Sequence, residues 1–281
     1  MSDSAISGPR PRASASSTFG RLAALAFAVL AVFLLLPFIG LLARVSPAVL
    51  VARLGDSAVL SALKLSFVTS VWATALVVLL GTPAAYLLAT RDFTGKRLVE
   101  VLVDLPMVLP PTVAGFALLM AFGRTGYAGR ALGLLGVSLP FTTAGVVAAQ
   151  VFMAAPFFIS PARAGFAGVD RRLVDAAATL RASEAFTFFR VVLPLAAPSL
   201  LAGVAMSAAR ALGEFGATIT FAGNLAGTTR TMPLAVYVAL QSDLDTAVVL
   251  SVLLLAMSFG LLLGLRAAPV GLFWNKQRAG A

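Results

Sequence analysis

Long runs of uncharged, mostly apolar residues alternate with short charged segments along this chain. A helix needs about 20 apolar residues to cross the hydrocarbon core of a bilayer. Six runs without Asp, Glu, Lys or Arg reach or approach that length, and they cover residues 22–43, 65–90, 105–123, 131–162, 191–209 and 246–265. The pattern therefore predicts an all-α integral membrane protein with six transmembrane helices.

The two ends of the chain are expected to be short tails. Residues 1–20 are rich in Ser, Pro and Gly, which is typical of disorder, and residues 269–281 are too few for a second folded domain. The first apolar run is longer than the roughly 7–15 residues of a secretory signal core, and no clear cleavage site follows it. We therefore expect a transmembrane domain over residues 21–268 that retains its first helix.

Composition agrees with a membrane protein and excludes several kinds of chemistry. Hydrophobic residues make up 60% of the chain and charged residues only 11%, whereas soluble domains are about 25% charged. The absence of Cys and His excludes disulfides, thiolate nucleophiles, histidine proton transfer and most zinc and haem sites. We therefore expect no metal site and no cofactor in this chain.

The basic residues are distributed as an orientation signal. The net charge of +10 would suit a nucleic-acid partner if the basic residues formed one patch. Counted over alternate loops, however, 14 of the 21 Lys and Arg residues fall on one side of the membrane, six fall on the other, and Arg210 lies inside the fifth span. Loops rich in Lys and Arg stay in the cytoplasm. We predict that both termini are cytoplasmic and that no nucleic acid is bound.

The cytoplasmic segment between spans four and five, about 165–192, is predicted to form two short helices. Asp170 is placed to cap the first helix and Ser183 to cap the second. Pro194 suits the first turn of span five. The apolar face of the first helix consists of Leu173, Ala176, Ala177 and Leu180. Such a hairpin either rests on lipid headgroups or docks a soluble protein, and the alanine-rich face, a poor membrane anchor, slightly favours the protein.

The run DAAATLRASEAFTFFRVVLPLA (residues 175–196) resembles the EAA loop of ABC-importer permeases. In that family the loop forms coupling helices that fit a cleft in the ATP-hydrolysing subunit. The resemblance implies that the docking residues are Asp175, Ala176, Ala177, Leu180, Arg181, Ser183 and Phe186. Two positions depart from the pattern, because Asp175 replaces the usual Glu and Arg181 stands where the family has Gly. A turn with positive φ would be strained at Arg181.

Span five carries two opposite charges, Arg210 and Glu214, four residues apart. A charge in the middle of a membrane helix costs about 2.5–3.5 kcal/mol, so such residues normally face protein or water. The two residues form either a structural ion pair or part of an anion route that Arg210 lines. Thr218 and Thr220 could offer hydroxyl donors to the route, and Gly213 and Gly216 suit either a hinge or tight packing. The helical spacing predicts that one face of span five holds Gly203, Ser207, Arg210, Glu214 and Ala217.

Span three contains Pro106, Pro110 and Pro111, which predict a kinked helix. A kink beside the pore would suit a gate, and irregular packing explains the prolines equally well. Asp104, near the cytoplasmic end of this span, is expected to contact either an Arg of the coupling loop or only water.

Three segments look like the molybdate permeases of ABC importers, and they are residues 104–126, 139–166 and 209–237 within a resemblance over about 57–266. The resemblance implies the type I importer fold, a homodimer that forms the pathway, and a position in the bacterial inner membrane. It also implies two ATP-binding subunits and a periplasmic or lipid-anchored oxyanion-binding protein. ATP and Mg would bind to those partner subunits, because this chain has no phosphate-binding loop and is not itself an enzyme. The implied substrate is molybdate, with tungstate as a second substrate.

Three other functions are weighed against this one. Permeases for sulfate or thiosulfate share a similar Arg-Ala-x-Gly-Glu-aromatic-Gly run. A secondary transporter would show matching halves, which this sequence lacks, and would not need the cytoplasmic loop. A membrane enzyme would need paired carboxylates at the headgroups, and Asp243 and Asp245 are better explained as a loop or helix cap.

Overall fold

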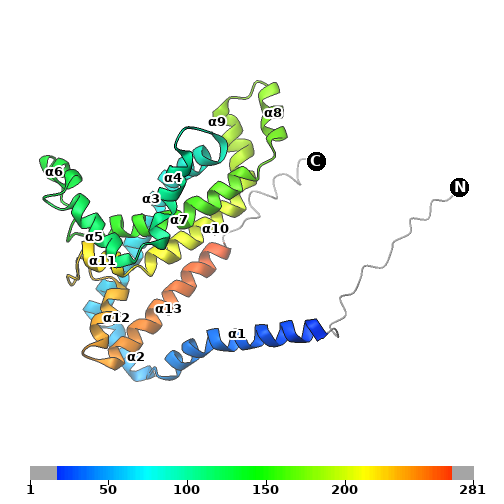
Figure 1. Ribbon diagram of the computed structural model, residues 1–281. Coiled ribbons are helices and arrows are strands. Elements are labelled where there is room, and N and C mark those ends of the chain that lie inside the picture. Colours follow the sequence, from blue (N-terminus) through cyan, green and yellow to red (C-terminus); the bar gives the residue numbers. More distant parts are fainter. Residues whose placement is uncertain (1–17, 268–281) are drawn as a thin grey trace. The chain divides into compact units, whose positions relative to one another are not determined.

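The computed structural model describes residues 18–267, and every regular element in that range is a helix (Figure 1). In chain order the elements are α1 (Thr18–Ala43), α2 (Pro47–Leu54), α3 (Ser57–Thr90), α4 (Lys96–Val108), α5 (Pro111–Phe122), α6 (Tyr127–Leu134), α7 (Thr143–Ala167), α8 (Arg171–Thr179), α9 (Glu184–Thr187), the π-helix η1 (Phe188–Val192), α10 (Leu193–Leu212), α11 (Gly216–Phe221), α12 (Met232–Leu240) and α13 (Leu244–Ala267). Among the described residues, five helical runs are long and apolar enough to cross a membrane, and a sixth candidate is the bent pair α4 and α5. The predicted all-α fold is confirmed.

The chain divides into two compact units, Met1–Val45 and Ser46–Ala281. In the first unit, α1 has no buried residue, and apolar side chains surround the helix on every side. Such a helix is suited to lipid on all its faces. It begins at Thr18, so residues 18–20 of the expected disordered tail are helical. The rest of that tail and residues 269–281 lie outside the described residues.

The third predicted span is two helices rather than one kinked helix. α4 and α5 form an angle of 120° at the break between Val108 and Pro111. Leu109 and Pro110 are extended there, with ψ near 136° and 130°. A residue that precedes proline is pushed out of the helical region, and two consecutive prolines impose this twice. Pro106 stays inside α4, so the pair Pro110 and Pro111 makes the bend.

At both ends of the fifth predicted span, the structure also differs from the prediction. α9, η1 and α10 form one continuous run from Glu184 to Leu212, so Pro194 does not start a separate helix as expected. The π turn explains this, because the N–H of Leu193 bonds to the carbonyl of Phe188, five residues back, and carries the helix past the proline. At the other end α10 stops at Leu212, and a short break leads into α11.

The core of the second unit is built by α3, α7 and α10, which run side by side (Figure 1). Phe158 of α7 is fully buried between two glycines. A Cβ atom on Gly81 of α3 would lie 2.8 Å from this ring, and one on Gly203 of α10 would lie 3.1 Å from it. Glycine at both positions lets the three helices approach closely, as small residues do in membrane proteins.

The contacts within this core fix the relative directions of the three helices. At its centre Ala73, Ala154 and Ala211 form one fully buried cluster, with one alanine from each of α3, α7 and α10. Gly81 of α3 is opposite Phe158 of α7. Gly81 follows the cluster residue of its helix by eight residues and Phe158 follows that of its own helix by four, so α3 and α7 run in the same direction. Gly203 is opposite Phe158 as well, but it precedes the cluster in α10, so α10 runs in the opposite direction.

Candidate functional site

The first candidate site is the α8–α9 hairpin, residues 168–187, which lies at one end of the α7–α10 pair, with α12 at the opposite end (Figure 1). Both predicted caps are confirmed. The carboxylate of Asp170 accepts a hydrogen bond of 2.9 Å from the backbone N–H of Arg172. The hydroxyl of Ser183 accepts one of 3.2 Å from the N–H of Phe186. These side chains stabilise the two helix starts because they bind N–H groups that lack partners within the helix.

The predicted apolar face of α8 is divided between the interior and the surface. Ala177 is half-buried, and so is Val174, which packs against the core and which sequence reasoning left without a role. Leu173 and Ala176 are exposed, and Leu180 has 83% of its surface exposed. The residues free to meet a partner are therefore Leu173, Ala176 and Leu180, with Asp175, Arg181, Ser183 and Phe186 also on the surface.

The turn between the two helices has the strain expected at Arg181. The φ angle of this residue is 58°, in the left-handed region that favours glycine. The N–H of Ala182 bonds to the carbonyl of Ala177 at 3.0 Å, and the N–H of Arg181 bonds to that of Ala178 at 2.9 Å. This pair of bonds defines a Schellman motif, in which the residue at the Arg181 position is usually glycine. The missing glycine changes the energy of the turn and not its shape.

Aromatic rings anchor the hairpin to the helices beneath it. Phe188 of η1 is packed edge-on against Tyr86 of α3 at 4.9 Å between ring centroids, and 6.1 Å from Phe166 of α7. Tyr86 and Phe166 also contact each other at 5.5 Å. An ion pair of 3.9 Å joins Arg91 to Glu184, but both side chains are mostly exposed, so it adds little. Phe188 thus links the base of the hairpin to both α3 and α7.

The second candidate site is the break between α10 and α11, where the predicted ion pair forms. The Nη2 atom of Arg210 lies 2.6 Å from Oε2 of Glu214. The Glu214 side chain is completely buried, while that of Arg210 is 23% exposed. The other carboxylate oxygen, Oε1, accepts a hydrogen bond of 2.7 Å from the N–H of Ala217 in the first turn of α11. Sequence reasoning missed this second role, which the three-residue spacing from Glu214 to Ala217 could have suggested.

The predicted single polar face of span five is interrupted at this break. Gly203 and Ser207 are buried within α10, and Arg210 is in its last turn. Gly213 ends the helix, so Glu214 is carried by the loop and not by the helix. Gly213 is the C-cap of α10, and its role as a hinge stays a prediction.

The α5 and α11 helices cross in close contact, which brings several predicted residues together. A Cβ atom on Gly216 would lie 2.6 Å from the Cβ of Pro111, and one on Gly115 would lie 2.6 Å from the carbonyl oxygen of Ala217. The hydroxyl of Thr220 donates to the carbonyl of Gly216, and Thr218 is fully buried. Neither hydroxyl is free on an accessible surface in this conformation.

Two further polar side chains belong to the same level of the core as Glu214. Ser70 precedes Ala73 by one turn in α3, and Gln150 precedes Ala154 by one turn in α7, while Glu214 follows Ala211. Because α10 runs opposite to the other two helices, all three side chains lie on the same side of the alanine cluster. Ser70 and Gln150 are almost fully buried, and the Ser70 hydroxyl and the Gln150 side-chain oxygen have no hydrogen-bonding partner within residues 18–267. We name Ser70, Gln150 and Glu214 the polar layer.

The prediction for Asp104 is wrong, because this residue contacts α7 and not an Arg of the coupling loop or only water. Its carboxylate accepts a hydrogen bond of 2.7 Å from the hydroxyl of Ser160 in α7. An ion pair of 3.0 Å between Glu100 and Arg163 joins the same two helices. Asp104 therefore fixes α4 against α7.

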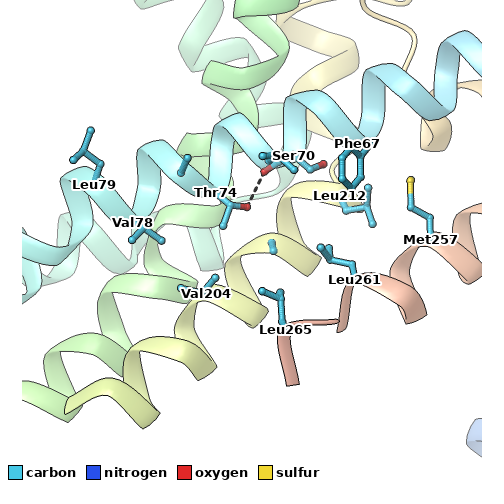
Figure 2. A pocket seen from close by; sticks show the side chains of 13 residues that line it. Phe67, Ser70, Thr74, Val78, Leu79, Val204, Leu212, Met257, Leu261 and Leu265 are labelled. Carbon is cyan, nitrogen blue, oxygen red and sulfur yellow. Dashed lines mark hydrogen bonds between the residues drawn. The ribbon is translucent and has the colours of Figure 1, made fainter. Parts of the chain in front are cut away.

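A groove of about 600 Å³ lies between α3, α10 and α13 (Figure 2). Its walls are apolar side chains such as Phe67, Leu212 and Met257, and the polar exceptions are Ser70 and Thr74. The Thr74 hydroxyl is already used, because it donates to the carbonyl of Ser70 at 2.7 Å (Figure 2). Such a surface suits hydrocarbon and offers nothing to hold an anion. The groove reaches Ser70 of the polar layer and Leu212 at the end of α10, but its apolar walls do not form an anion site.

The described residues contain no group of three or more His, Cys, Asp or Glu side chains that could hold a metal ion. The two candidate sites are thus a surface hairpin and a buried ion pair beside two crossed helices. The first suits binding of a protein and the second suits a moving or anion-lined passage.

Comparison with known proteins covers both sites. The family model described as "Binding-protein-dependent transport system inner membrane component" matches residues 78–267, which include the hairpin, the break and the bent pair. The chain belongs to this family. It is therefore a membrane-spanning permease subunit of an ABC transporter and not itself the catalyst.

The permease is similar over most of its length to several curated proteins. It is 42% identical to the molybdenum transport system permease protein ModB of Mycobacterium tuberculosis, over 85% of this chain and 91% of that protein. It is 40% identical to a probable molybdenum ABC transporter permease of Haloferax volcanii, over 84% and 85%. Identity to ModB of Escherichia coli K12 is 42%, over 56% of this chain and 69% of that protein.

Solved structures support the same fold. A chain of a bacterial ABC transporter that imports the polysaccharide alginate superposes with a TM-score of 0.72 at 15% sequence identity. The superposition covers 88% of this permease and 94% of that chain. At this level of identity the match concerns the fold alone, which is that of type I importer permeases.

Proposed function

We propose that this permease forms the membrane pathway of an ATP-driven importer for molybdate, with tungstate as a second substrate and two copies of the chain in each transporter. The observation that carries the proposal is the similarity to molybdenum permeases over 84–85% of the chain. The match includes the break that holds Arg210, the one cationic side chain that the sequence places within an apolar span. A chain of this kind works with two ATP-binding subunits and a periplasmic or lipid-anchored binding protein.

The α8–α9 hairpin is the proposed docking site for an ATP-binding subunit. Its exposed apolar side chains are Leu173, Ala176 and Leu180, and nothing within residues 18–267 covers them. Both helices are capped, and the π turn joins the hairpin to α10 without a flexible linker. A rigid hairpin with small and apolar side chains on its surface fits a cleft on a protein better than a lipid surface.

The proposed orientation places both termini, the hairpin and the α3–α4 loop in the cytoplasm. The excess of Lys and Arg in these segments is the primary support. Two ion pairs agree with it. Arg91 and Glu184 join two segments that were both assigned to the cytoplasm, and Arg53 and Asp243 join two that were both assigned to the outside.

Arg210 is the proposed contact for the anion. Its ion pair is one turn from the alanine cluster, and Ala73 and Ala154 of that cluster are near the middle of α3 and α7. The guanidinium therefore lies deep in the membrane, where the attraction between a positive charge and an oxyanion is little weakened by water. The proposed gate is the α5–α11 crossing beside Arg210, with Pro110, Pro111 and Gly216.

Reconstitution tests the proposal. The permease should be purified with its ATP-binding subunits, inserted into liposomes and supplied with the binding protein. Molybdate should stimulate ATP hydrolysis and accumulate inside, and tungstate should compete better than sulfate. Preference for sulfate would assign the chain to a sulfate importer, and uptake without any ATP-binding subunit would remove the importer assignment altogether.

A further inference from the structure

We propose that Glu214 is a built-in competitor for the oxyanion. In the described conformation Glu214 is paired with the guanidinium of Arg210. An anion in transit takes the place of the carboxylate at the guanidinium, and the anion is released when the ion pair forms again. This inference rests on the proposed function. It adds a residue that sets the affinity of the pathway for its substrate.

The two side chains differ in how firmly they are held. Glu214 is completely buried, and its Oε1 atom is bound to the N–H of Ala217, so the carboxylate is fixed to the start of α11. Arg210 is partly exposed, in the last turn of α10, and within residues 18–267 its guanidinium has only Glu214 as a polar partner. Exchange of partners therefore requires movement of the arginine and leaves the glutamate in place.

The guanidinium has the donors that an oxyanion needs. Its planar fork carries five N–H groups, and it binds carboxylates and tetrahedral oxyanions through the same pairs of donors. Oε2 of Glu214 lies 2.6 Å from the Nη2 atom of Arg210, and this oxygen accepts no hydrogen bond within the described residues. The exposed fraction of the side chain leaves other N–H groups for an arriving anion, which then completes its binding by displacing the carboxylate.

Ser70 supplies the carboxylate with a donor when it loses Arg210. Ser70 lies on the same side of the alanine cluster as Glu214, and its hydroxyl carries a proton that can be donated to a carboxylate oxygen. A buried polar atom without a partner is costly, and the Ser70 hydroxyl has no hydrogen-bonding partner within residues 18–267. Its function in this proposal is to stabilise Glu214, where it stands, during the exchange.

Competition of this kind explains how an anion leaves a low-dielectric pathway. A lone arginine near the middle of a membrane would hold a doubly charged anion too tightly for rapid release. An internal partner that occupies the arginine for 90–99% of the time lowers the apparent affinity by about 10- to 100-fold. Once the anion is bound, the nearby carboxylate repels it, and the repulsion favours its departure.

The decisive variant is Glu214→Gln, which keeps the size of the side chain and removes its charge. The probe is sodium molybdate added to the assembled transporter without the binding protein, and the readout is the molybdate-dependent rise in unfolding temperature. We expect Glu214→Gln to bind molybdate about tenfold more tightly than the wild type and to import it more slowly. Arg210→Gln should abolish the molybdate-dependent rise. Glu100→Gln, which removes a partly buried ion pair of 3.0 Å between α4 and α7, serves as the matched control and should leave the affinity unchanged.

Unchanged affinity and unchanged import rate in Glu214→Gln would overturn the proposal and leave the pair as a structural contact. If this variant does not assemble, Glu214→Asp should show the same changes to a smaller degree, because the shorter side chain holds Arg210 less well. Repeating the titration with sulfate separates this inference from the substrate assignment. If the wild type prefers sulfate, and Glu214→Gln binds sulfate more tightly and releases it more slowly, the molybdate assignment is wrong. The same result would support the role of Glu214 as a competitor for the anion.

Discussion

A Cβ atom on Gly115 would lie 2.6 Å from the carbonyl oxygen of Ala217, so the backbones of α5 and α11 touch where they cross. A side chain cannot enter this contact without moving one helix. We expect Gly115→Ala to destabilise the permease by about 1–3 kcal/mol through overpacking and to slow import. Thermal unfolding of the purified transporter and an uptake assay measure the two effects.

Gly133→Ala is the matched control for this crossing. Gly133 is in α6, and a Cβ atom there would meet nothing within 4 Å. The control should be neutral or slightly stabilising, because alanine favours a helix more than glycine does. Equal stability and uptake for the two variants would show that the α5–α11 crossing tolerates separation and is not a tight contact.

The hairpin gives a prediction about assembly. Leu180→Glu combined with Ala176→Asp places two charges on the exposed face of α8 and should prevent co-purification of the ATP-binding subunit, while membrane insertion continues. Ala177 is a poorer choice for this test, because it is half-buried and its replacement would disturb the hairpin itself.

Leu135→Glu controls for the added charge, since Leu135 is 76% exposed at the end of α6, away from the hairpin. This variant should keep its ATP-binding subunits. Retained co-purification in the α8 double variant would mean that the subunit docks elsewhere.

Arg181 predicts a stabilising substitution. A non-glycine residue in the left-handed region costs roughly 1–2 kcal/mol, so Arg181→Gly should stabilise the turn by about 1 kcal/mol. Arg181→Ala removes the same charge and retains the strained backbone. Only the glycine variant should therefore raise the unfolding temperature, and an equal rise in both would assign the effect to the charge.

The ion pair predicts an asymmetry between single and double variants. Arg210→Ala leaves the buried carboxylate of Glu214 without its cation, which should cost roughly 3 kcal/mol or more. Arg210→Ala combined with Glu214→Ala removes both charges and should be less damaging than the single change. Expression level and thermal unfolding of the three proteins give the comparison, and equal stability of the single and double variants would argue against coupling.

Asp243 predicts a dependence on pH outside the membrane-spanning helices. Hydrogen bonds from the hydroxyl and the N–H of Thr246, together with the charge of Arg53, hold the pKa of this carboxyl below its usual range. Because its pKa is lower in the folded state, its stabilising effect is fully present above the ordinary pKa of about 3.9 and is lost as the pH falls through the lower value.

The wild type should consequently be more stable than Asp243→Asn at neutral pH, and the difference should shrink as the pH falls below about 4. Unfolding temperatures between neutral and strongly acidic pH measure this difference. Asp245→Asn is the control, because Asp245 starts α13 without an ion pair to Arg53. A difference that stays constant with pH would mean that the Asp243 carboxylate has no special environment.

The sequence predicted the elements that depend on local chemistry. Asp170 and Ser183 cap their helices as expected, because a cap needs only a side-chain oxygen and the N–H groups two or three residues later. The ion pair between Arg210 and Glu214 was equally predictable, since two opposite charges in a membrane have few alternatives. The predicted strain at Arg181 is confirmed by its φ angle.

The backbone restriction at consecutive prolines and the tertiary packing of helices explain what the sequence analysis did not predict. Uncharged length alone suggests one helix over residues 105–123, whereas the consecutive prolines at 110 and 111 bend the chain by 120°. Val174 was not predicted as the inward residue of α8, because two neighbouring apolar stripes are indistinguishable until the core that one of them meets is known. Ser70 and Gln150 were missed for the same reason, since each looks like an isolated polar residue until three helices are aligned.

The π turn at Phe188–Val192 has a mechanical consequence. It makes Glu184–Leu212 one rigid rod, with the docking surface near one tip and the guanidinium of Arg210 near the other. From Glu184 to Arg210 the rod is about 39 Å long. If the ATP-binding subunit tilts the hairpin end of the rod by about 5°, the end that carries Arg210 moves by roughly 3 Å. That distance is about one hydrogen-bond length, enough to part Arg210 from its carboxylate without any unfolding in between.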